Sequence, residues 1–320
     1  MLARFVDAVM EATVVPSFSR SGYQVRRRLF GWRPVETDLS GRTVLLTGAT
    51  SGIGRAAAVE LARLGARIVT VGRSSQRGET AVAGIRKESG NHAVDFVELD
   101  IGDLAAVARF GDEFAEKESH LDALVHNAGA LWPERRTTNQ DVEMTLAVHL
   151  LGPYVLTERL RPLLAATSGA RLIFMSSGGM YALGLDLDEL EAGADRYDGR
   201  AAYSRVKRAQ VVLAELLANQ YAGDGIVVHS MHPGWADTAG VEAGIPGFRK
   251  VARPILRTAE EGADTLVWLV AADEPAASTG GFWHDRARRN PVKLPWTRPD
   301  ATARNELEPW IEARISRAPG

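Results

Sequence analysis

Tyr203 and Lys207 lie four residues apart in a segment with helical periodicity, so both side chains fall on one face of the predicted helix. A phenol with its ordinary pKa of about 10 is a poor base at neutral pH. Because an adjacent ammonium favours the phenolate, we expect Lys207 to lower the pKa of Tyr203 toward the range that general acid–base catalysis needs. An isolated pair with this spacing is more often only structural, so its meaning depends on the motifs around it.

Three glycines, at positions 48, 52 and 54, separate an apolar run (residues 43–46) from a helical pattern (residues 55–64). Gly48 permits a sharp turn, Gly52 lets the backbone come close to a pyrophosphate, and Gly54 lets the helix pack close to the strand. The free N–H groups at the start of the helix attract the anion. The stretch therefore predicts a strand–turn–helix unit that binds a dinucleotide. The alternative is an ordinary turn between a strand and a helix.

These residues must be positioned by the elements around them, and strand and helix patterns alternate along the chain. Continuous apolar strands separated by helices predict a Rossmann-type α/β fold, with a doubly wound parallel sheet flanked by helices. We expect an N-terminal arm (1–40), one dinucleotide-binding and catalytic domain (41–284) and a C-terminal tail (285–320). The predicted strands cover residues 43–46, 66–71, 92–99, 121–125, 171–175, 226–231 and 280–283, and the predicted helices cover residues 55–64, 75–89, 103–118, 139–164, 203–220, 259–271 and 301–315.

The bulk composition bounds the class of protein. A hydrophobic fraction of 45% and a charged fraction of 24% in 320 residues are typical of a globular protein with a full core. The net charge of −2 provides no basic face for nucleic acid, and the absence of cysteine excludes disulfides and a thiolate nucleophile. Asp7 and Glu11 interrupt the apolar pattern of the first residues, which therefore differ from a signal peptide. We expect a cytoplasmic protein without a membrane-spanning helix.

Five motifs occur in one order along the chain, namely Thr47-Gly-Ala-Thr-Ser-Gly-Ile-Gly54, Asn127-Ala-Gly129, Ser176-Ser177, Tyr203-Ser-Arg-Val-Lys207 and Pro233-Gly-Trp-Ala-Asp-Thr238. Together they resemble the short-chain dehydrogenase/reductase family, from about residue 43 to residue 283. The segments that begin at Ser176 and Ser230 are similar to one branch of that family, the member 12 group. The resemblance implies an oxidoreductase that transfers a hydride between a nicotinamide cofactor and an alcohol or carbonyl group.

The resemblance also implies a role for each motif residue. Tyr203 is the general acid/base, Lys207 holds the nicotinamide ribose while tuning Tyr203, and Ser177 hydrogen-bonds the substrate oxygen. Ser176 is the neighbouring alternative to Ser177, because consecutive strand residues point in opposite directions. The expected cofactor contacts, besides Tyr203 and Lys207, are Gly48, Ser51, Gly52, Ile53, Gly54, Arg73, Asp100 at the adenine end, Ile101, Asn127, Ala128, Gly129, Pro233, Gly234 and Thr238.

The chain departs from the family pattern in two places. His149 stands where the family has an asparagine that helps to seat a water in the proton relay. A histidine can support or reroute such a relay, or it can mark weakened activity, so His149 is a fourth catalytic candidate. The separation between Ser177 and Tyr203 is also longer than the family commonly shows. We interpret the inserted segment, residues 180–199, as a flap over the site whose acidic side chains (Asp186, Asp188, Glu189 and Glu191) form a solvated face.

The end of the second strand distinguishes the two nicotinamide cofactors. An acid there hydrogen-bonds the ribose hydroxyls of NAD, whereas an arginine accommodates the 2′-phosphate of NADP. Arg73 occupies this position, the strand ends without an acid, and Arg55 after the glycine turn is placed to assist. NADP(H) is therefore favoured over NAD(H).

The substrate is less well defined by the sequence than the cofactor. Aromatic and apolar side chains from the loops predict a lipophilic alcohol or ketone, although several of them, Trp283 in particular, can instead belong to the core. The candidate wall residues are Trp132, Met180, Tyr181, Trp235, Phe248, Phe282 and Trp283.

A second function fits the same motifs, namely a nucleotide-binding regulatory or scaffold protein with impaired catalysis, and His149 is the feature that supports it. We discount a metal enzyme built on His229 and His232, and expect no metal site, because the two histidines do not share a strand face and acidic ligands are absent. The expected partner is a small-molecule substrate and not a nucleic acid. By resemblance, helices 203–220 and 259–271 can form homo-oligomer contacts.

The two ends of the chain leave alternatives open. Leu2, Phe5 and Val9 share a helical face with Val6 and Met10, and a basic and aromatic cluster follows at residues 26–32. This arm either packs over the domain, which is the more common case, or makes peripheral contact with a membrane surface. The basic start of the tail, residues 286–289, either covers the substrate mouth or is solvated, and we favour the second.

Overall fold

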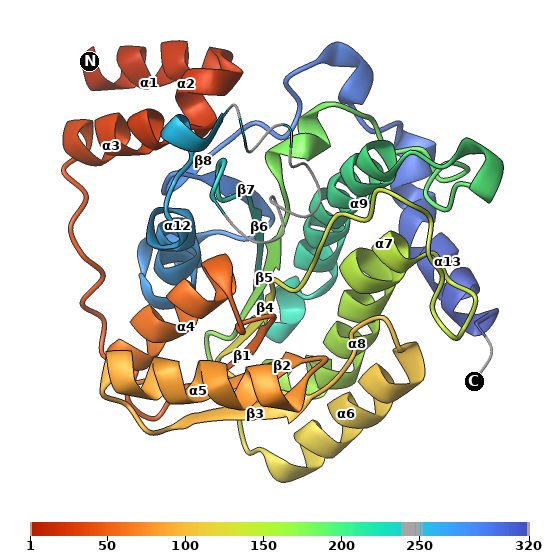
Figure 1. Cartoon of the computed structure of the whole chain (residues 1–320), viewed down its shortest axis with the longest axis horizontal. Helices are drawn as coiled ribbons and strands as arrows, with labels where there is room; N and C mark the ends of the chain where they lie inside the picture. The colour runs from red at the N-terminus through yellow and green to blue at the C-terminus, as the bar shows by residue number, and fades with distance from the viewer. Residues whose placement is uncertain (1, 238–246, 248–249, 251, 319–320) are drawn as a thin grey trace.

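The computed structural model describes residues 2–237, 247, 250 and 252–318. Its centre is an eight-stranded sheet in the order β3-β2-β1-β4-β5-β6-β7-β8 (Figure 1). The first seven strands are parallel, and β8 pairs antiparallel with β7. The predicted doubly wound parallel sheet is therefore confirmed. The strands are β1 (Thr43–Thr47), β2 (Arg67–Gly72), β3 (Val94–Glu98), β4 (Ala123–His126), β5 (Arg171–Met175), β6 (Val227–Met231), β7 (Gly281–His284) and β8 (Ala287–Arg288).

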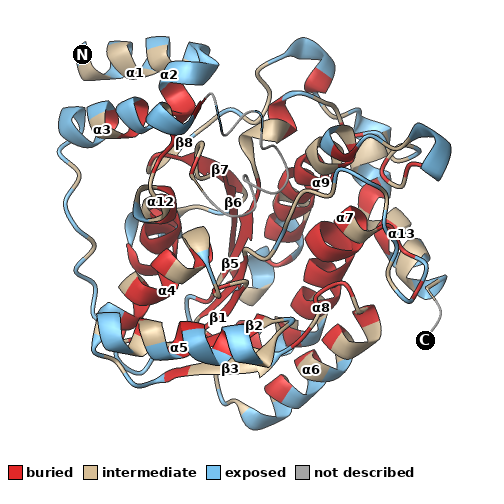
Figure 2. Ribbon diagram, in the orientation of Figure 1, coloured by how far each residue is buried: buried red, intermediate tan, exposed pale blue. Residues whose placement is uncertain are grey.

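Helices cover both faces of this sheet, and the buried residues gather on the strands and on the helix sides that face them (Figure 2). One face carries α4 (Gly52–Arg63), α5 (Ser75–Ser89) and α12 (Ala259–Ala271). The other face carries α6 (Leu104–Lys117), α8 (Gly152–Ala165) and α9 (Gly199–Gln220). Helix α6 is capped by the Asp103 side chain, which accepts a hydrogen bond from the Ala106 N–H.

The long helix predicted from residue 139 begins later than the pattern indicated. A short helical turn, α7 (Met144–Leu146), and a π-helical turn at Ala147–Leu151 lead into α8. Residues 139–143 are not helical, because Thr137 and Glu143 pair as an isolated β-bridge and Asp141 has a left-handed φ of 52°. The Glu143 carboxylate then caps α7 by accepting from two backbone N–H groups. The polar side chains of this segment thus form a cap and not a first helical turn.

The N-terminal arm consists of α1 (Leu2–Ala12), α2 (Val14–Phe18) and α3 (Arg20–Leu29), and it lies along the β7–β8 edge of the molecule (Figure 1). Arg26 connects it to the domain. The Arg26 side chain is 0% exposed and forms ion pairs with Asp7 (2.7 Å), Glu11 (2.9 Å) and Asp285 (2.7 Å). Arg257 contacts the other oxygen of Asp285 at 2.6 Å. One buried carboxylate therefore ties the arm to the sheet edge.

The basic start of the tail is solvated at Arg288, but our prediction is wrong for Arg286 and Arg289. Arg286 pairs with Asp264 at 2.6 Å, and Arg289 pairs with Asp7 at 2.7 Å. After these ion pairs the chain forms α13 (Ala301–Ser316), which lies against α9 and buries its Leu307 there. One side of α9, a helix that the resemblance assigns to oligomer contacts, is thus covered by the chain itself.

Candidate active site

One cavity opens at the carboxyl ends of the parallel strands, where the order of the sheet reverses between β1 and β4. The glycine turn, the ends of β2, β4 and β5, the start of α9 and the loop after β6 all line it. Every predicted cofactor residue lies on its wall except Thr238, which lies outside the described residues. The lining set includes Gly48, Ser51, Gly52, Ile53, Gly54, Arg73, Asp100, Ile101, Asn127, Ala128, Gly129, Tyr203, Lys207, Pro233 and Gly234.

The glycine turn has the geometry that its sequence predicts. Gly48 and Gly52 have left-handed φ angles of 75° and 55°, which residues with a Cβ rarely adopt. A Cβ on Gly54 would lie 2.5 Å from the Gly48 carbonyl oxygen, so only glycine lets the start of α4 approach the turn this closely. The backbone N–H groups at the start of α4 are thereby brought to the cavity wall.

Asn127 fixes the end of β4 to this turn. Its side-chain amide donates to the Thr47 carbonyl at 2.9 Å and to the Gly48 carbonyl at 3.1 Å. The backbone N–H groups of Asn127 and Ala128 both donate to the Thr47 hydroxyl at 3.0 Å. Two loops from neighbouring strands therefore form one rigid wall at the middle of the cavity.

The predicted catalytic residues meet at the far end of the same cavity. Tyr203, in the first turns of α9, shares a side-chain hydrogen bond with Ser177, and Ser177 itself follows β5. Ser176 is the less suitable alternative, because its buried hydroxyl donates to the Lys207 backbone carbonyl at 2.8 Å. Burial raises the pKa of Tyr203, and the bond with Ser177 opposes this only in part. The expected downward shift of this pKa is therefore wrong for the protein without cofactor.

The surroundings of Lys207 explain why it does not lower the pKa of Tyr203. Its side chain is buried among uncharged groups, with Nζ donating to the Met175 carbonyl at 2.8 Å and to the Gln210 side-chain oxygen at 3.0 Å. Burial lowers the pKa of Lys207 to about 7, so the ammonium is only partly populated at neutral pH. Nζ lies 5.5 Å from the centre of the Tyr203 ring, and its charge does not offset the burial of the phenol.

Gln210 is a residue of the site that the sequence analysis missed. Its carbonyl oxygen accepts from Lys207, and its amide donates to the backbone carbonyl of His149 at 2.5 Å. The side chain is 1% exposed, so both bonds lie out of water. The sequence does show an amide side chain three residues after Lys207, on the helix side that faces the core. It could not show that this amide contacts His149, which lies in a different helical segment.

His149 lies beside Tyr203 without a hydrogen bond to it. The two rings meet edge to face with centres 5.3 Å apart, and His149 Nε2 contacts the Ala130 carbonyl at 2.8 Å. A Cβ on Gly129 would lie 2.1 Å from the His149 ring, so the glycine makes room for it. Burial, and next the charge of Lys207, lower the pKa of His149 well below 6.5. The imidazole is therefore neutral, and its Nδ1 is buried without a partner among the described residues.

Two arginines lie at the end of β2, where the cofactor phosphate is expected. Arg73 and Arg77 both line the cavity, and neither forms an ion pair within the described part of the chain. Arg55 does not assist them, contrary to our expectation, because it pairs with Glu88 on α5 at 2.6 Å. Arg77 was missed, although it lies four residues after Arg73 in the first turn of α5.

The substrate end of the cavity has fewer aromatic residues than predicted. Trp132 and Trp235 line it, together with Leu131 and Leu256. Phe248 lies outside the described residues. Four other candidates are core residues: Met180, Tyr181 and Phe282 form a buried cluster with Phe18 of the arm, and Trp283 packs with Trp268 of α12.

The inserted segment is not a flap over the cavity. None of residues 180–199 lines it; instead Leu185 and Leu190 are buried in the core under α13. Two of its acids are also not simply solvated, since Glu191 pairs with Arg314 at 2.5 Å and Glu189 pairs with Arg196 at 2.8 Å. Asp186 and Asp188 are exposed, as predicted.

Known proteins are similar to this chain in sequence and fold over most of its length. The family model "short chain dehydrogenase" matches residues 42–243. Dehydrogenase/reductase SDR family member 12 of Bos taurus is 35% identical, over 90% of this chain and 90% of that protein. Polyprenol dehydrogenase of Mus musculus is 34% identical, over 84% of each chain. A crystal structure of an Escherichia coli short chain dehydrogenase complexed with NADPH superposes with a TM-score of 0.64 at 25% identity, over 79% of this chain and 100% of that one.

Proposed function

The chain belongs to the short-chain dehydrogenase/reductase family, whose members are oxidoreductases acting on CH–OH groups, and from this premise we propose an NADP(H)-dependent reductase of lipophilic carbonyl compounds. The observation that carries the proposal is the pairing of the Ser177 and Tyr203 side chains beside Lys207, in the cavity that also contains the glycine turn. A proton donor, a second hydroxyl and an anion-binding helix start thus share one site.

The cavity wall fits a dinucleotide. The left-handed Gly52 and the close approach of Gly54 bring free N–H groups of α4 to the position that a pyrophosphate needs. When bound, the cofactor supplies or accepts the hydride at nicotinamide C4. In its ammonium form Lys207 has three N–H donors, of which Met175 and Gln210 engage two, so one stays available for a ribose hydroxyl.

The residues around the reacting oxygen favour the reducing direction. As negative charge develops on the carbonyl oxygen, the Tyr203 hydroxyl would donate its proton to that oxygen, which leaves Tyr203 as a phenolate. The Ser177 hydroxyl donates a hydrogen bond to the same oxygen and stabilises the developing charge. Because burial raises the pKa of Tyr203, the phenol keeps its proton at neutral pH and is ready to donate it.

The preference for NADP(H) rests on Arg73 and Arg77, which lack carboxylate partners within the described residues and lie where the 2′-phosphate would bind. The double variant Arg73→Ala/Arg77→Ala should weaken NADPH binding by about 10- to 100-fold and leave NADH binding nearly unchanged. Fluorescence titration measures both affinities. Arg109→Ala, on the exposed side of α6, is the matched control. Equal losses for the two cofactors would argue against the preference.

A lipophilic substrate is supported by the apolar end of the cavity, with Trp132, Trp235 and Leu256, and by relatives named for the long-chain alcohols polyprenol and retinol. The test follows NADPH consumption with a series of ketones and aldehydes of increasing chain length. We expect kcat/KM to rise with length, and a preference for short polar carbonyls would contradict the proposal.

A second function, cofactor binding without turnover, is favoured by one specific observation. The neutral His149 ring stands in the relay position, and Gln210 connects Lys207 to the backbone of the same histidine. Tight NADPH binding without turnover on any carbonyl would support this function. Recovery of turnover in His149→Asn would then identify the histidine as the cause.

A further inference from the structure

The first helix of the arm is amphipathic in the reverse sense. A surface helix normally turns its apolar face to the core and its charged face to water. In α1 the two acids face inward: Asp7 contacts Arg26 and Arg289, both at 2.7 Å, and Glu11 contacts Lys293 at 2.7 Å. None of the residues of α1 is fully buried: Val6 and Met10 are half-buried, and the ion pairs of Asp7 and Glu11 fix the helix to the domain.

The apolar face of α1 consequently points to solvent. Leu2, Phe5 and Val9 are 73%, 67% and 52% exposed, and their spacing places them on one side of the helix. Across the described residues, eight of the ten exposed large apolar side chains belong to this arm, and the other two are Leu294 and Trp296. The eight are Leu2, Phe5, Val9, Val14, Val15, Val25, Leu29 and Phe30.

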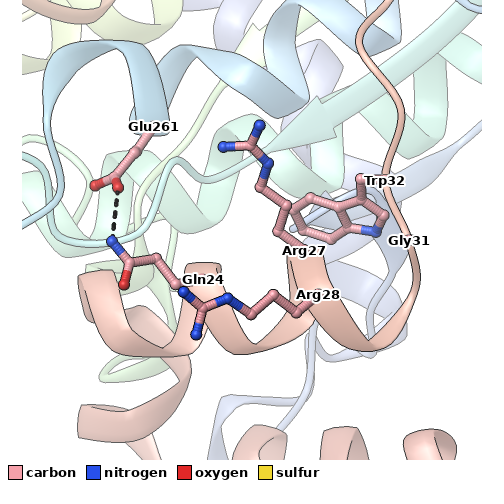
Figure 3. Close-up of a pocket in the computed structure, with 6 residues that line it drawn as sticks. All are labelled: Gln24, Arg27, Arg28, Gly31, Trp32 and Glu261. Carbon is pink, nitrogen blue, oxygen red and sulfur yellow. Dashed lines mark hydrogen bonds between the residues drawn. The ribbon is translucent and has the colours of Figure 1, made fainter.

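The exposed charges of residues 2–33, which cover the three arm helices and the turn after them, have one sign, whereas Glu36 and Asp38 after that turn are exposed acids. Between residues 2 and 33 the only acids are Asp7 and Glu11, and the exposed charged residues are Arg4, Arg20, Arg27, Arg28 and Arg33. Figure 3 shows Arg27 and Arg28 beside Trp32 in a hollow on α3. The hydrogen bond drawn there joins Gln24 to Glu261, and neither Arg27 nor Arg28 has an ion pair within the described part of the chain.

We propose that this arm docks the enzyme on an anionic lipid membrane, with the apolar side chains in the interfacial region and the arginines on lipid phosphates. Exposed Leu, Phe and Val beside arginine is the composition of helices that lie in the membrane interface. The one-signed charge complements anionic headgroups, each arginine near the surface adding to the attraction. The arm lies at the outside of the molecule (Figure 1), so its helices can reach a flat surface.

The test is co-sedimentation of the full chain with vesicles of phosphatidylcholine alone and of phosphatidylcholine with phosphatidylglycerol. The wild-type protein should bind the anionic vesicles, and added salt should weaken this binding. Arg27→Glu/Arg28→Glu should reduce the affinity by about 30-fold or more. Its control is Arg109→Glu/Arg317→Glu, which changes two exposed arginines on α6 and at the end of α13 by the same charge.

A second pair of variants tests the apolar contribution. Phe5→Ser should weaken binding to both vesicle types, and Trp296→Ser, which removes the other strongly exposed aromatic side chain (69%), should not. NADPH affinity reports that every variant is folded. The proposal is overturned if the wild-type protein stays in solution with anionic vesicles, or if the control variants lose as much binding as the arm variants. A change of oligomeric state in Phe5→Ser, without vesicle binding by the wild type, would assign the surface to a second copy of the chain instead.

Discussion

Two buried cations in this protein have opposite surroundings. Arg26 is 0% exposed and Lys207 is 3% exposed, so both side chains are desolvated. Arg26 has three carboxylates around it, and these outweigh the desolvation that would lower its pKa, which is raised. Lys207 has only two neutral oxygens, and burial lowers its pKa to about 7.

Because of this difference, the charge of Arg26 serves the fold, whereas the proton of Lys207 is available for acid–base chemistry. The carboxylates fix the charge of Arg26 and make its contacts part of the fold, because removing a partner leaves an uncompensated buried charge. The neutral partners of Lys207 hold its position but leave its proton exchangeable near neutral pH. Burial alone therefore does not decide the direction of a cation's pKa shift; the carboxylates around Arg26 and their absence around Lys207 give the two groups opposite shifts.

The largest expected effect is on turnover and belongs to the active site, where Lys207 lies. Tyr203→Phe should lower kcat by about 10²- to 10⁴-fold, because the substrate oxygen loses its proton donor. The free energy of unfolding should change little, since only the hydrogen bond with Ser177 is lost. Turnover with NADPH and urea unfolding measure the two quantities. A variant with full turnover would remove Tyr203 from the proposed mechanism.

The next effect is on stability and belongs to the arm. Asp285→Asn should destabilise the protein by about 3–5 kcal/mol, because Arg26 and Arg257 lose the carboxylate that they share. Urea unfolding measures this loss. Asp112→Asn, which breaks the exposed pair with Arg159, is the control and should have no measurable effect. Equal stability of the Asp285 and Asp112 variants would show that the buried pairs do not hold the arm.

A pH series then separates the two cations. An unfolded chain keeps the Lys207 proton up to a pKa of 10.5, whereas the native protein keeps it only below about 7. Between these values the unfolded state binds more protons, so the free energy of unfolding rises with pH. Relative to Lys207→Met, the wild type should gain about 1.4 kcal/mol per pH unit between pH 7 and 9. A constant difference would contradict the lowered pKa.

The smallest effect is expected when Lys207 is given an acidic partner, as Arg26 has. Gln210→Glu gives Lys207 the acidic neighbour that Asp285 gives Arg26, so the pKa of Lys207 should rise and its pH-dependent gain in stability should disappear. Turnover should fall by about tenfold as the lysine becomes a fixed charge. The isosteric Gln210→Met separates charge from shape, because it removes the acceptor without adding an acid. Wild-type pH dependence in Gln210→Glu would mean that the bond between the two side chains is unimportant.

Local patterns were enough for much of the cofactor half of the site. The glycine turn, the strands and α5 were predicted within a few residues, because a turn, a strand or a helix depends mainly on residues close in sequence. Predictions failed where the partner was distant. Tyr181 and Phe282 pack under Phe18, and Arg289 pairs with Asp7, a residue 282 positions earlier in the chain. The residue type alone identified none of these partners.

The sequence by itself determined the order of elements, the turn that fits a dinucleotide, and the spacing that places Tyr203 and Lys207 on one helix face. Only the tertiary structure decided the state of these groups. Burial in the folded protein lowers the pKa of Lys207, and the reversed orientation of α1 depends on Arg26 and Asp285, which lie 259 positions apart. Periodicity is encoded in neighbouring residues, whereas desolvation and charge pairing depend on what the completed fold brings into contact.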